Sequence, residues 1–421
     1  MEPIAVADAA RAAAAVVASA TTTTKNAALA RMAELLDERR ADIVAANAAD
    51  RAAAEERGIE QNLLDRLSFD GARIDSRIAS LETIVGLPDP VGSATAAWRC
   101  ANGMDAARVR VPLGVILMVF EARPHVTVNA GAFCLKAGNA CILRGGFEAR
   151  RCNALLGELW ATALAAAGLP REAIQVVSGT HAEVGELLQF DSHIDLVIPR
   201  GGPGLIRAVA EQSRIPVIKH FNGVCHVYLD SGIDLDRGLD IALDGKCLMP
   251  QVCNATESVL VHRDHAPQLP RIVAAFRDNG VTVRGCPAVC AAVGDVEAAS
   301  EEDWSTEYLD LTVSLRVVDD VDAAADHINT YGSHHTDSIV TDSEPRARRF
   351  TQVVDSSVVL TNASTMYCDG ASLGMGAEIG ISTDRLHARG PMGLADLTTT
   401  KYVIRGDHHV MGPARCTGEG A

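Results

Sequence analysis

The chain has 421 residues, of which 48% are hydrophobic and 22% charged, and its formal net charge is −16. This length predicts two or more domains, and an acidic balance without a Lys/Arg-rich block argues against nucleic acid and anionic membranes as partners. No apolar run approaches the roughly 20 residues of a membrane span, and Glu2 and Asp8 stand where a signal peptide carries positive charge, so a cytoplasmic location is expected.

The first 70 residues are predicted to be helical. Ala, Leu and Arg dominate this segment, and its apolar residues recur at helical spacing. A further helix is expected over residues 73–87. Two short strands are expected over residues 98–110, around the turn signal Asn102-Gly103.

From residue 114 onwards, short β-rich runs alternate with helical runs. The alternation predicts strands over residues 114–121 and 140–146, with later ones up to Arg200, and it indicates a parallel α/β sheet. Such a sheet binds ligands at the carboxyl ends of its strands. A second α/β series is expected from about residue 230, followed from Leu373 by a Gly-rich, irregular tail with a final strand.

Two Gly-rich turns follow predicted strands. The stretch "IPRGGPG" places Arg200, Gly201 and Gly202 between a strand and a helix, where backbone amides favour anions. A plain tight turn explains that stretch equally well. The stretch "ILRGGFEA" ends a strand with Arg144 and Gly145, and Arg144 is either a surface side chain or a ligand for phosphate or ribose.

The eleven cysteines are scattered and contain no CxxC pair, which is typical of free thiols in a reducing compartment and gives no convincing metal motif. Cys253 differs from the others because it lies in a predicted turn, with Pro250 and Asn254 nearby. A reactive thiolate needs such an exposed setting near backbone amides. Cys225 lies in a β-rich run and is expected to be structural. The polar segment 321–340 is either a hydrated loop or a functional one.

Several segments together resemble the γ-glutamyl phosphate reductase family, a branch of the aldehyde dehydrogenase superfamily. The resemblance runs nearly end to end and in order. The segments that carry it are "VPLGVILMVFEARPHVTV" (111–128), "LKAGNACILRGG" (135–146), "IDLVIPRGGPGLI" (194–206), "IPVIKHFNGVCHVYLD" (215–230), "CNATES" (253–258), "HINTYGSHHTDSIV" (327–340), "VDSSVVLTNAST" (354–365) and "GAEIGISTDRLHARGPMGL" (376–394).

The resemblance implies an α/β, aldehyde-dehydrogenase-like fold of two α/β domains with a small β oligomerisation flap. The NADP-binding domain would comprise residues 1–93 and 112–227, and the catalytic domain residues 228–395. The flap would comprise residues 94–111 and 396–421, and its presence favours a homo-oligomer, either a dimer or a tetramer.

The resemblance also implies the chemistry. Cys253 of the "CN" motif would be the nucleophile, and its thiolate would displace phosphate from L-glutamyl 5-phosphate to give a thioester. NADPH would reduce the thioester to L-glutamate 5-semialdehyde, a step of proline biosynthesis. Backbone amides at the turn of Cys253 and Asn254 are suited to stabilise the oxyanion.

The implied cofactor contacts come from the same resemblance. Arg144, next to Gly145, would face the adenosine ribose or its 2′-phosphate, and an Arg there suits NADP. Glu307 would hold the nicotinamide ribose. The turn that passes the pyrophosphate would contain Arg200, Gly201 and Gly202. No metal is expected.

Substrate contacts are hypotheses of a different kind, because the amino-acid end of the substrate needs cationic and carboxylate partners. Arginine and histidine side chains are the candidates for its anionic groups, and two glutamates are the candidates for its ammonium group. The candidates are Arg123, Arg385, His387 and Arg389 for the anions, and Glu121 and Glu378 for the ammonium.

Three departures from the family pattern are visible, and one of them is Ala325, which stands where a branched aliphatic residue is usual. Hydrolytic aldehyde dehydrogenases carry a Glu base where this chain has Lys219–His220. A phosphorylating enzyme needs no water-activating base, so this difference fits the phosphorylating branch. His125 stands where Asn or Asp is usual, and it bears on the fine contacts to the substrate.

Three alternatives stay open at this stage. The chain could be another phosphorylating or CoA-linked aldehyde dehydrogenase, a non-redox Cys hydrolase that works without nicotinamide, or a silent oligomeric scaffold. The substrate, an acyl phosphate, is labile, and contact with glutamate 5-kinase, which would supply it, is a further hypothesis.

Overall fold

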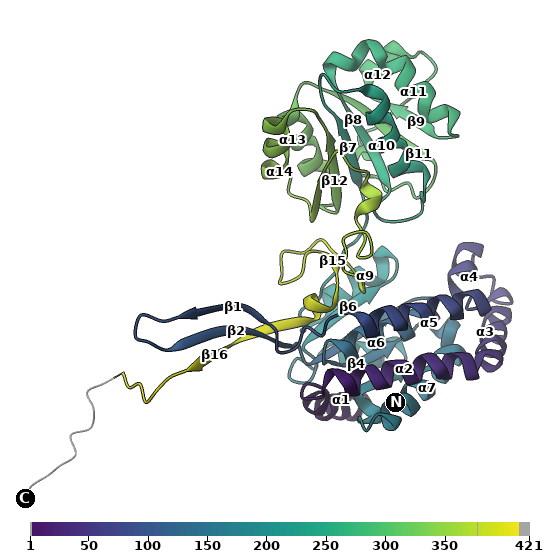
Figure 1. Cartoon of the computed structure of the whole chain (residues 1–421). Helices are drawn as coiled ribbons and strands as arrows, with labels where there is room; N and C mark the ends of the chain where they lie inside the picture. The colour runs from purple at the N-terminus through teal and green to yellow at the C-terminus, as the bar shows by residue number, and fades with distance from the viewer. Residues whose placement is uncertain (1, 377, 412–421) are drawn as a thin grey trace, which may run out of the picture. The chain divides into compact units, whose positions relative to one another are not determined.

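The computed structural model describes residues 2–376 and 378–411. The chain forms two compact units, coloured along the sequence in Figure 1. Unit 1 comprises Met1–Met118, Ala122–Leu196 and Leu394–Ala421, and unit 2 comprises Val119–Glu121 and Val197–Gly393.

The division between the units differs from the predicted domain boundary at residue 227. In the structure, residues 197–227 belong to unit 2. Strand β7 (Cys225–Leu229) begins before residue 227 and pairs in register with a strand of unit 2, so a boundary at 227 would cut through a sheet strand. Strand β7 is short and apolar and follows an irregular segment, so the sequence alone does not show which sheet it joins.

Unit 1 begins with five helices, as the sequence predicts for residues 1–70 and 73–87. Thr21 caps the second helix by accepting a hydrogen bond from the N–H of Thr24, and Asp70 caps the fifth by accepting one from the N–H of Arg73. The helices are α1 (Pro3–Val17), α2 (Thr22–Glu38), α3 (Arg40–Glu55), α4 (Gln61–Leu67) and α5 (Gly71–Gly86).

A four-stranded sheet follows, with strand order β5-β4-β3-β6. Its apolar central strands, β3 and β4, are buried along their whole length, which is the pattern of a sheet covered on both faces. The strands are β3 (Val115–Phe120), β4 (Ala140–Arg144), β5 (Ile174–Val177) and β6 (Leu196–Arg200). The helices between and after them are α6 (Pro124–Lys136), α7 (Arg150–Ala166), α8 (His181–Leu187) and α9 (Pro203–Gln212).

Unit 2 contains a seven-stranded sheet of order β10-β9-β11-β8-β7-β12-β13, in which every assigned strand pair is parallel. The remaining strands are β8 (Thr256–His262), β9 (Thr282–Gly285), β10 (Glu297–Ala298), β11 (Thr312–Val318), β12 (Thr336–Val340) and β13 (Val358–Thr361). The helices are α10 (Leu235–Cys247), α11 (Leu269–Asp278), α12 (Pro287–Ala292), α13 (Val321–Tyr331) and α14 (Glu344–Val353).

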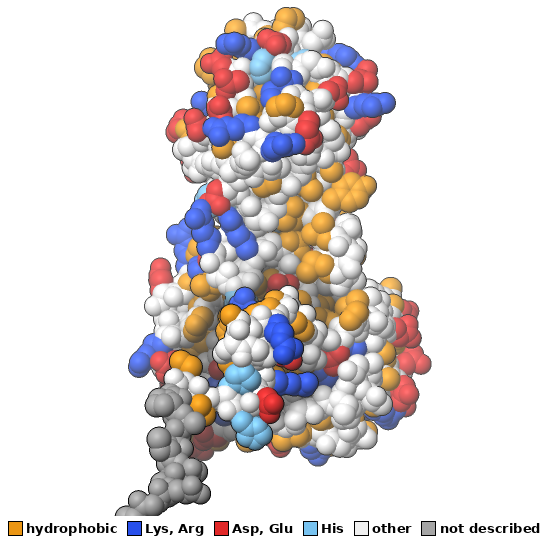
Figure 2. Space-filling model, turned by 60° about the vertical axis from the view of Figure 1, so that its left-hand side comes forward, with side chains coloured by type: hydrophobic (Ala, Val, Ile, Leu, Met, Phe, Trp, Pro, Cys, Tyr) orange, Lys and Arg blue, Asp and Glu red, His pale blue; other side chains and the backbone are white. Residues whose placement is uncertain are grey.

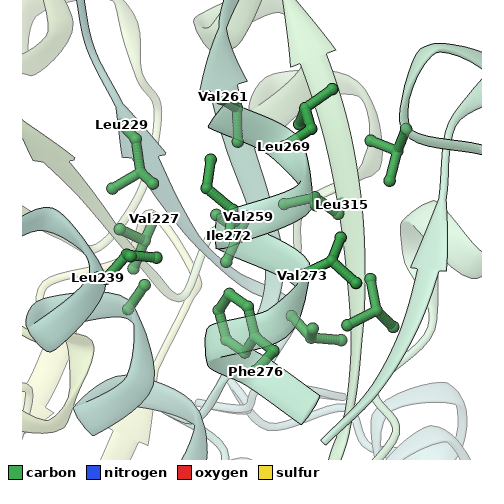
Figure 3. Close-up of a cluster of buried hydrophobic side chains, with 14 of the residues drawn as sticks. Val227, Leu229, Leu239, Val259, Val261, Leu269, Ile272, Val273, Phe276 and Leu315 are labelled. Atoms are coloured by element: carbon green, nitrogen blue, oxygen red, sulfur yellow. The ribbon is translucent and has the colours of Figure 1, made fainter. Parts of the chain in front are cut away.

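Alternate residues of the central strands of unit 2 pack on opposite faces of the sheet. Val227 and Leu229 of β7 join a core that includes Phe276 of α11 (Figure 3). Tyr228, which lies between them, belongs to a second core and stacks on Phe350 of α14 with ring centroids 6.4 Å apart. This period of two makes β7 a strand covered on both sides and fixes its register.

The predicted strand pair near Asn102-Gly103 is confirmed, and a third strand from the C-terminal part of the chain joins the same sheet. Strands β1 (Ala94–Arg99), β2 (Asp105–Pro112) and β16 (Thr398–Arg405) form an antiparallel sheet of order β1-β2-β16, in which the three strands lie side by side (Figure 1). Residues 412–421 of the predicted flap lie outside the described residues.

One short segment differs from the sequence interpretation. The tail after Leu373 was expected to be irregular up to the last strand, but it contains the antiparallel pair β14 (Gly380–Ser382) and β15 (Gly390–Met392). Strands of three residues between glycines carry no usable periodicity. The polar segment 321–340 forms α13 and β12, a helix and a strand of the predicted second α/β series, and it buries Asp337, so it is not a hydrated loop.

Short 3₁₀ helices connect several of these elements. They are Phe147–Ala149, Arg171–Ala173, Arg263–Gln268, Glu302–Ser305, Thr365–Tyr367 and Leu394–Leu397. Figure 2 shows Lys and Arg side chains interspersed with Asp and Glu over the visible face of the α/β part of unit 2. Among the described helices, none is both long and apolar enough to cross a membrane.

Candidate active site

Cys253 lies in the loop between α10 and β8, within unit 2, and its side chain is partly exposed. Gly223 packs directly on its backbone, since a Cβ at Gly223 would stand 1.7 Å from the carbonyl oxygen of Cys253. The thiol of Cys225 donates to the same carbonyl at 3.3 Å. Contacts from Gly223 and from the buried thiol of Cys225 therefore fix the backbone of the loop that contains Cys253. Cys225 has a structural role, as the sequence predicts.

Asn254 fixes the other side of the loop. Its side chain is 8% exposed, and its amide donates to the backbone carbonyls of Thr365 and Met366 at 3.2 and 3.3 Å. A third, longer contact reaches the carbonyl of Cys368 at 3.4 Å. The side chain of Asn254 is engaged in positioning the loop, so any oxyanion contact at this turn falls to backbone N–H groups.

Burial raises the pKa of the Cys253 thiol to about 11. The positive charge of Arg200 lowers this pKa, whereas the carboxylates of Glu307 and Glu378 raise it. In the ligand-free chain the thiol is therefore protonated at neutral pH. A ligand that brings further positive charge or displaces a carboxylate favours the thiolate.

This protonation state predicts how Cys253 reacts in the ligand-free chain. Its alkylation by iodoacetamide is expected to accelerate about tenfold per pH unit between about pH 8 and about pH 10, because the thiolate fraction grows at that rate below the pKa. The rate is followed by mass spectrometry of the Cys253 peptide. A rate that is already constant above about pH 8 would show that a base activates the thiol without ligand.

Arg200 ends β6, and its positive charge acts on the Cys253 thiol. Gly380 packs against Arg200, since a Cβ at Gly380 would stand 2.9 Å from the guanidinium Nη1. The same positive charge lowers the pKa of Glu378, which burial raises above its ordinary value, and the carboxylate of Glu378 accepts a hydrogen bond from the N–H of Gly370 at 3.0 Å. Arg200 thus supplies positive charge to the Cys253 thiol as well as ending a strand.

The Gly-rich turn after Arg200 is already occupied by an anion of the chain itself. The N–H of Gly202, at the start of α9, donates to the carboxylate of Glu121 at 2.8 Å. Gly201 permits this approach, because a Cβ there would stand 2.4 Å from the same carboxylate oxygen. Glu121 caps the helix in this state. Its predicted contact with a substrate ammonium and the pyrophosphate contact of the turn stay predictions.

Glu307 joins the same loop through Gly223, whose N–H donates to the Glu307 carboxylate at 2.9 Å. Burial raises the pKa of Glu307. Since Gly223 packs on Cys253, the carboxylate and the thiol are held by one turn. This is a suitable place for a group that acts on a ligand beside Cys253.

Lys246 and Glu257 form a buried ion pair behind this loop, and sequence reasoning missed both. The Lys246 Nζ lies 2.6 Å from the Glu257 carboxylate, and the two side chains are 0% and 1% exposed. Burial raises the pKa of Glu257, and Lys246 opposes that rise. The helical spacing could have revealed Lys246 as buried, because it lies on the same buried face of α10 as Leu239 and Ala242.

Arg144 and Gly145 lie in unit 1, where they line a cavity of about 510 Å³. Arg144 ends β4 beside the end of β5, is 8% exposed and donates to the carbonyl of Gly179 at 3.1 Å. The other lining residues include Ser178, Thr180 and Glu183. The cavity lies at the carboxyl ends of two parallel strands, the place where such sheets bind nucleotides.

Two of the predicted anion ligands share one acidic partner within unit 2. Arg385 and Arg389 both pair with Asp355, and the Arg389 contact is 2.9 Å. Burial raises the pKa of Asp355, but hydrogen bonds from the two arginines outweigh it and lower the pKa below its ordinary value. His387 is exposed between them, whereas Arg123 lies in unit 1 at the start of α6.

A sequence model of the aldehyde dehydrogenase family matches residues 3–281. A γ-glutamyl phosphate reductase of Anaeromyxobacter sp. (strain Fw109-5) is 51% identical over 392 residues, which is 92% of each chain. One of Desulfatibacillum aliphaticivorans is 47% identical over 407 residues, covering 96% of this chain and 97% of the relative. The chain belongs to the γ-glutamyl phosphate reductase branch of the aldehyde dehydrogenase family.

The crystal structure of a γ-glutamyl phosphate reductase from Thermotoga maritima superposes with a TM-score of 0.96 at 42% identity, covering 98% of this chain and 100% of that one. The predicted fold class, an aldehyde-dehydrogenase-like α/β fold, is thereby confirmed. Membership of this family makes the chain an oxidoreductase and implies a nicotinamide cofactor.

Proposed function

We propose that the chain reduces L-glutamyl 5-phosphate to L-glutamate 5-semialdehyde with release of phosphate, using NADPH, as a step of proline biosynthesis. The observation that carries the proposal is Cys253, held in a fixed loop beside Arg200, in a chain about half identical to γ-glutamyl phosphate reductases. The relatives supply the name of the substrate, and the loop supplies a nucleophile suited to it.

In the first step the Cys253 sulfur attacks the acyl carbon of the substrate. A carbon–sulfur bond forms, the bond from that carbon to the phosphate oxygen breaks, and phosphate leaves with its electron pair. Because burial keeps the thiol protonated, its proton has to leave before the attack, and overall it is taken up by the released phosphate. The positive charge of Arg200 favours the thiolate. The product is a thioester on Cys253.

Both tetrahedral stages place negative charge on the former carbonyl oxygen. The backbone N–H groups of Cys253 and Asn254 are assigned to this oxyanion, since the Asn254 side chain already donates to backbone carbonyls. Asn254 is therefore a positioning residue. Gly223 keeps the loop in place by packing on the carbonyl of Cys253.

The cavity of unit 1 fits the 2′-phosphorylated end of a dinucleotide. The cavity of about 510 Å³ at the ends of β4 and β5 contains a guanidinium, Arg144, that suits the 2′-phosphate of NADPH. Glu307 is assigned to the nicotinamide ribose, and the turn at Gly201 to the pyrophosphate. When bound, the cofactor supplies the hydride that reduces the thioester.

Arg144→Ala is expected to raise the KM for NADPH at least about tenfold and to change the KM for NADH little, because only NADPH carries the 2′-phosphate that a guanidinium binds. Initial rates with each cofactor test this. Arg171→Ala, at an exposed position of unit 1 that does not line this cavity, is the matched control. Equal changes in the KM values for NADPH and NADH would show that Arg144 does not contact the 2′-phosphate.

The position of the hydrolytic Glu base is taken by side chains that serve structure. Lys219 pairs with Asp384 at 3.1 Å, and a ring nitrogen of His220 lies 3.0 Å from the carbonyl of Ile381. Neither residue is a carboxylate that could activate water against a thioester. This supports phosphate, rather than water, as the partner of the acyl group.

Assembly and location belong to the same proposal. The cavity of unit 1 would bind NADP, and unit 2 would carry the catalytic loop. The three-stranded flap exposes Trp98, Tyr402 and Ile404, which favours a homo-oligomer, a dimer or a tetramer, formed through this sheet. The enzyme would work in the cytoplasm, and contact with glutamate 5-kinase would protect the labile acyl phosphate.

The reverse reaction tests the proposal most economically. With glutamate 5-semialdehyde and NADP, the chain is expected to form NADPH only when phosphate is present. Coenzyme A in place of phosphate separates the proposal from a CoA-linked aldehyde dehydrogenase. Reduction that needs CoA, or substrate turnover without any nicotinamide cofactor, would overturn it.

A further inference from the structure

A second group of cations, outside the catalytic loop and the cofactor cavity, lies in unit 1. Arg66 of α4, Arg73 and Arg77 of α5, and His125 of α6 line a cavity of about 290 Å³. Three helices meet here, and each contributes a basic side chain to the same space. The cavity is large enough for a small organic anion.

The acidic residues near these arginines in sequence are engaged elsewhere. Asp65 accepts a hydrogen bond from Gln61, and Asp75 pairs with Arg40 at 2.6 Å. Asp70 caps α5 at the N–H of Arg73. The neighbouring carboxylates therefore do not neutralise the cavity.

The three guanidinium groups themselves have no carboxylate partner within residues 2–376 and 378–411. Elsewhere in unit 1, Arg31, Arg40 and Arg151 each pair with Asp or Glu. Burial lowers the pKa of Arg77, and the neighbouring charge of Arg73 lowers it further. Like charges are thus held together in a chain whose net charge is −16.

Local hydrogen bonds hold two of these side chains in place without neutralising them. Arg73 donates to the backbone carbonyl of Ser68 at 2.5 Å, and Arg77 donates to the hydroxyl of Ser76 at 2.8 Å. Each guanidinium has five N–H donors, so donors remain after these contacts. A preformed group of cations binds an anion at a smaller entropic cost than mobile side chains do.

We propose that this cavity is a binding site for a phosphate group. Phosphate oxygens match the planar fork of guanidinium donors, and several forks around one anion give both affinity and geometric selectivity. The imidazole of His125, which lines the same cavity, is a further hydrogen-bonding group for a phosphate. The source is either inorganic phosphate or the phosphate of a small organic ester, and both present the same group to the three arginines.

Binding at this cavity is measured without turnover and without the nicotinamide cofactor. Calorimetric titration of the full-length chain with inorganic phosphate is expected to show a site that Arg66→Gln and Arg77→Gln each weaken at least about tenfold. Arg237→Gln removes the same charge from an exposed position in unit 2, where the side chain is 85% exposed, and is expected to bind like the wild type.

O-Phospho-L-serine, a stable amino-acid phosphate, distinguishes the two sources. Tighter binding of this ester than of inorganic phosphate, lost in Arg66→Gln, identifies an organic phosphate as the ligand, and weaker binding identifies inorganic phosphate. The proposal is overturned if Arg66→Gln and Arg77→Gln bind both compounds as the wild type does. Far-ultraviolet circular dichroism of both variants checks that α4 and α5 are folded.

Discussion

Cys253→Ala is expected to fold normally and to lose at least about a thousandfold in the rate of NADPH oxidation with the acyl phosphate, because the covalent route needs its sulfur. The loop itself does not depend on this side chain. Gly223 packs on the backbone of Cys253, Cys225 donates to the backbone carbonyl, and Asn254 donates to other backbone carbonyls. The variant should therefore unfold at the temperature of the wild type.

Cys247→Ala is the matched control for this loss. Cys247 ends α10, six residues before Cys253 (253 − 247 = 6), and is also a partly exposed free thiol. Its replacement is expected to leave the rate within about threefold of the wild type, since a single truncation of a partly exposed side chain perturbs the structure little. A Cys253→Ala variant that retains more than a few per cent of the wild-type rate would remove the sulfur from the mechanism.

Lys246→Met is expected to lower the free energy of unfolding by about 3–5 kcal/mol near pH 8, because it leaves the carboxylate of Glu257 buried without its cation. Both side chains are almost completely buried, and the Lys246 Nζ lies 2.6 Å from that carboxylate. Urea unfolding followed by fluorescence measures the loss. Arg237→Ala, on the exposed side of the same helix, should change the stability by less than about 0.5 kcal/mol.

The free energy of unfolding of Lys246→Met should fall as pH rises. Without Lys246, burial raises the folded-state pKa of Glu257 further above its unfolded value, so the folded state holds a proton that the unfolded state releases. The stability of the variant is then greatest below the unfolded pKa and falls as pH rises through the folded pKa. An equal loss in the free energy of unfolding near pH 5 and near pH 8 would show that the variant does not bury a charged Glu257 carboxylate.

Most of the fold could be predicted from the sequence because its signals are local. The apolar runs of β3 and β8 and the helical spacing of α2 and α7 mark elements without any knowledge of their partners. Strands β14 and β15 were missed because three residues between glycines show no period.

The candidate site was predictable only in part. Pro250 and Asn254 marked the turn of Cys253, which the structure places as a loop between helix and strand. The capping of Gly202 by Glu121 joins residues that are 81 positions apart, and no local pattern reveals such a pair. The pairing of Arg385 with Asp355 likewise depends on the topology of unit 2.

The central claim is that the acyl group is carried on the sulfur of Cys253, and a trapping experiment tests it directly. The wild-type chain is mixed with isotopically labelled glutamyl phosphate in the absence of cofactor, quenched in acid and digested, and the peptides are analysed by mass spectrometry. A glutamyl thioester on Cys253, absent from Cys253→Ala, is the predicted result. Label on another side chain, or on none while the chain turns over with cofactor, would contradict it.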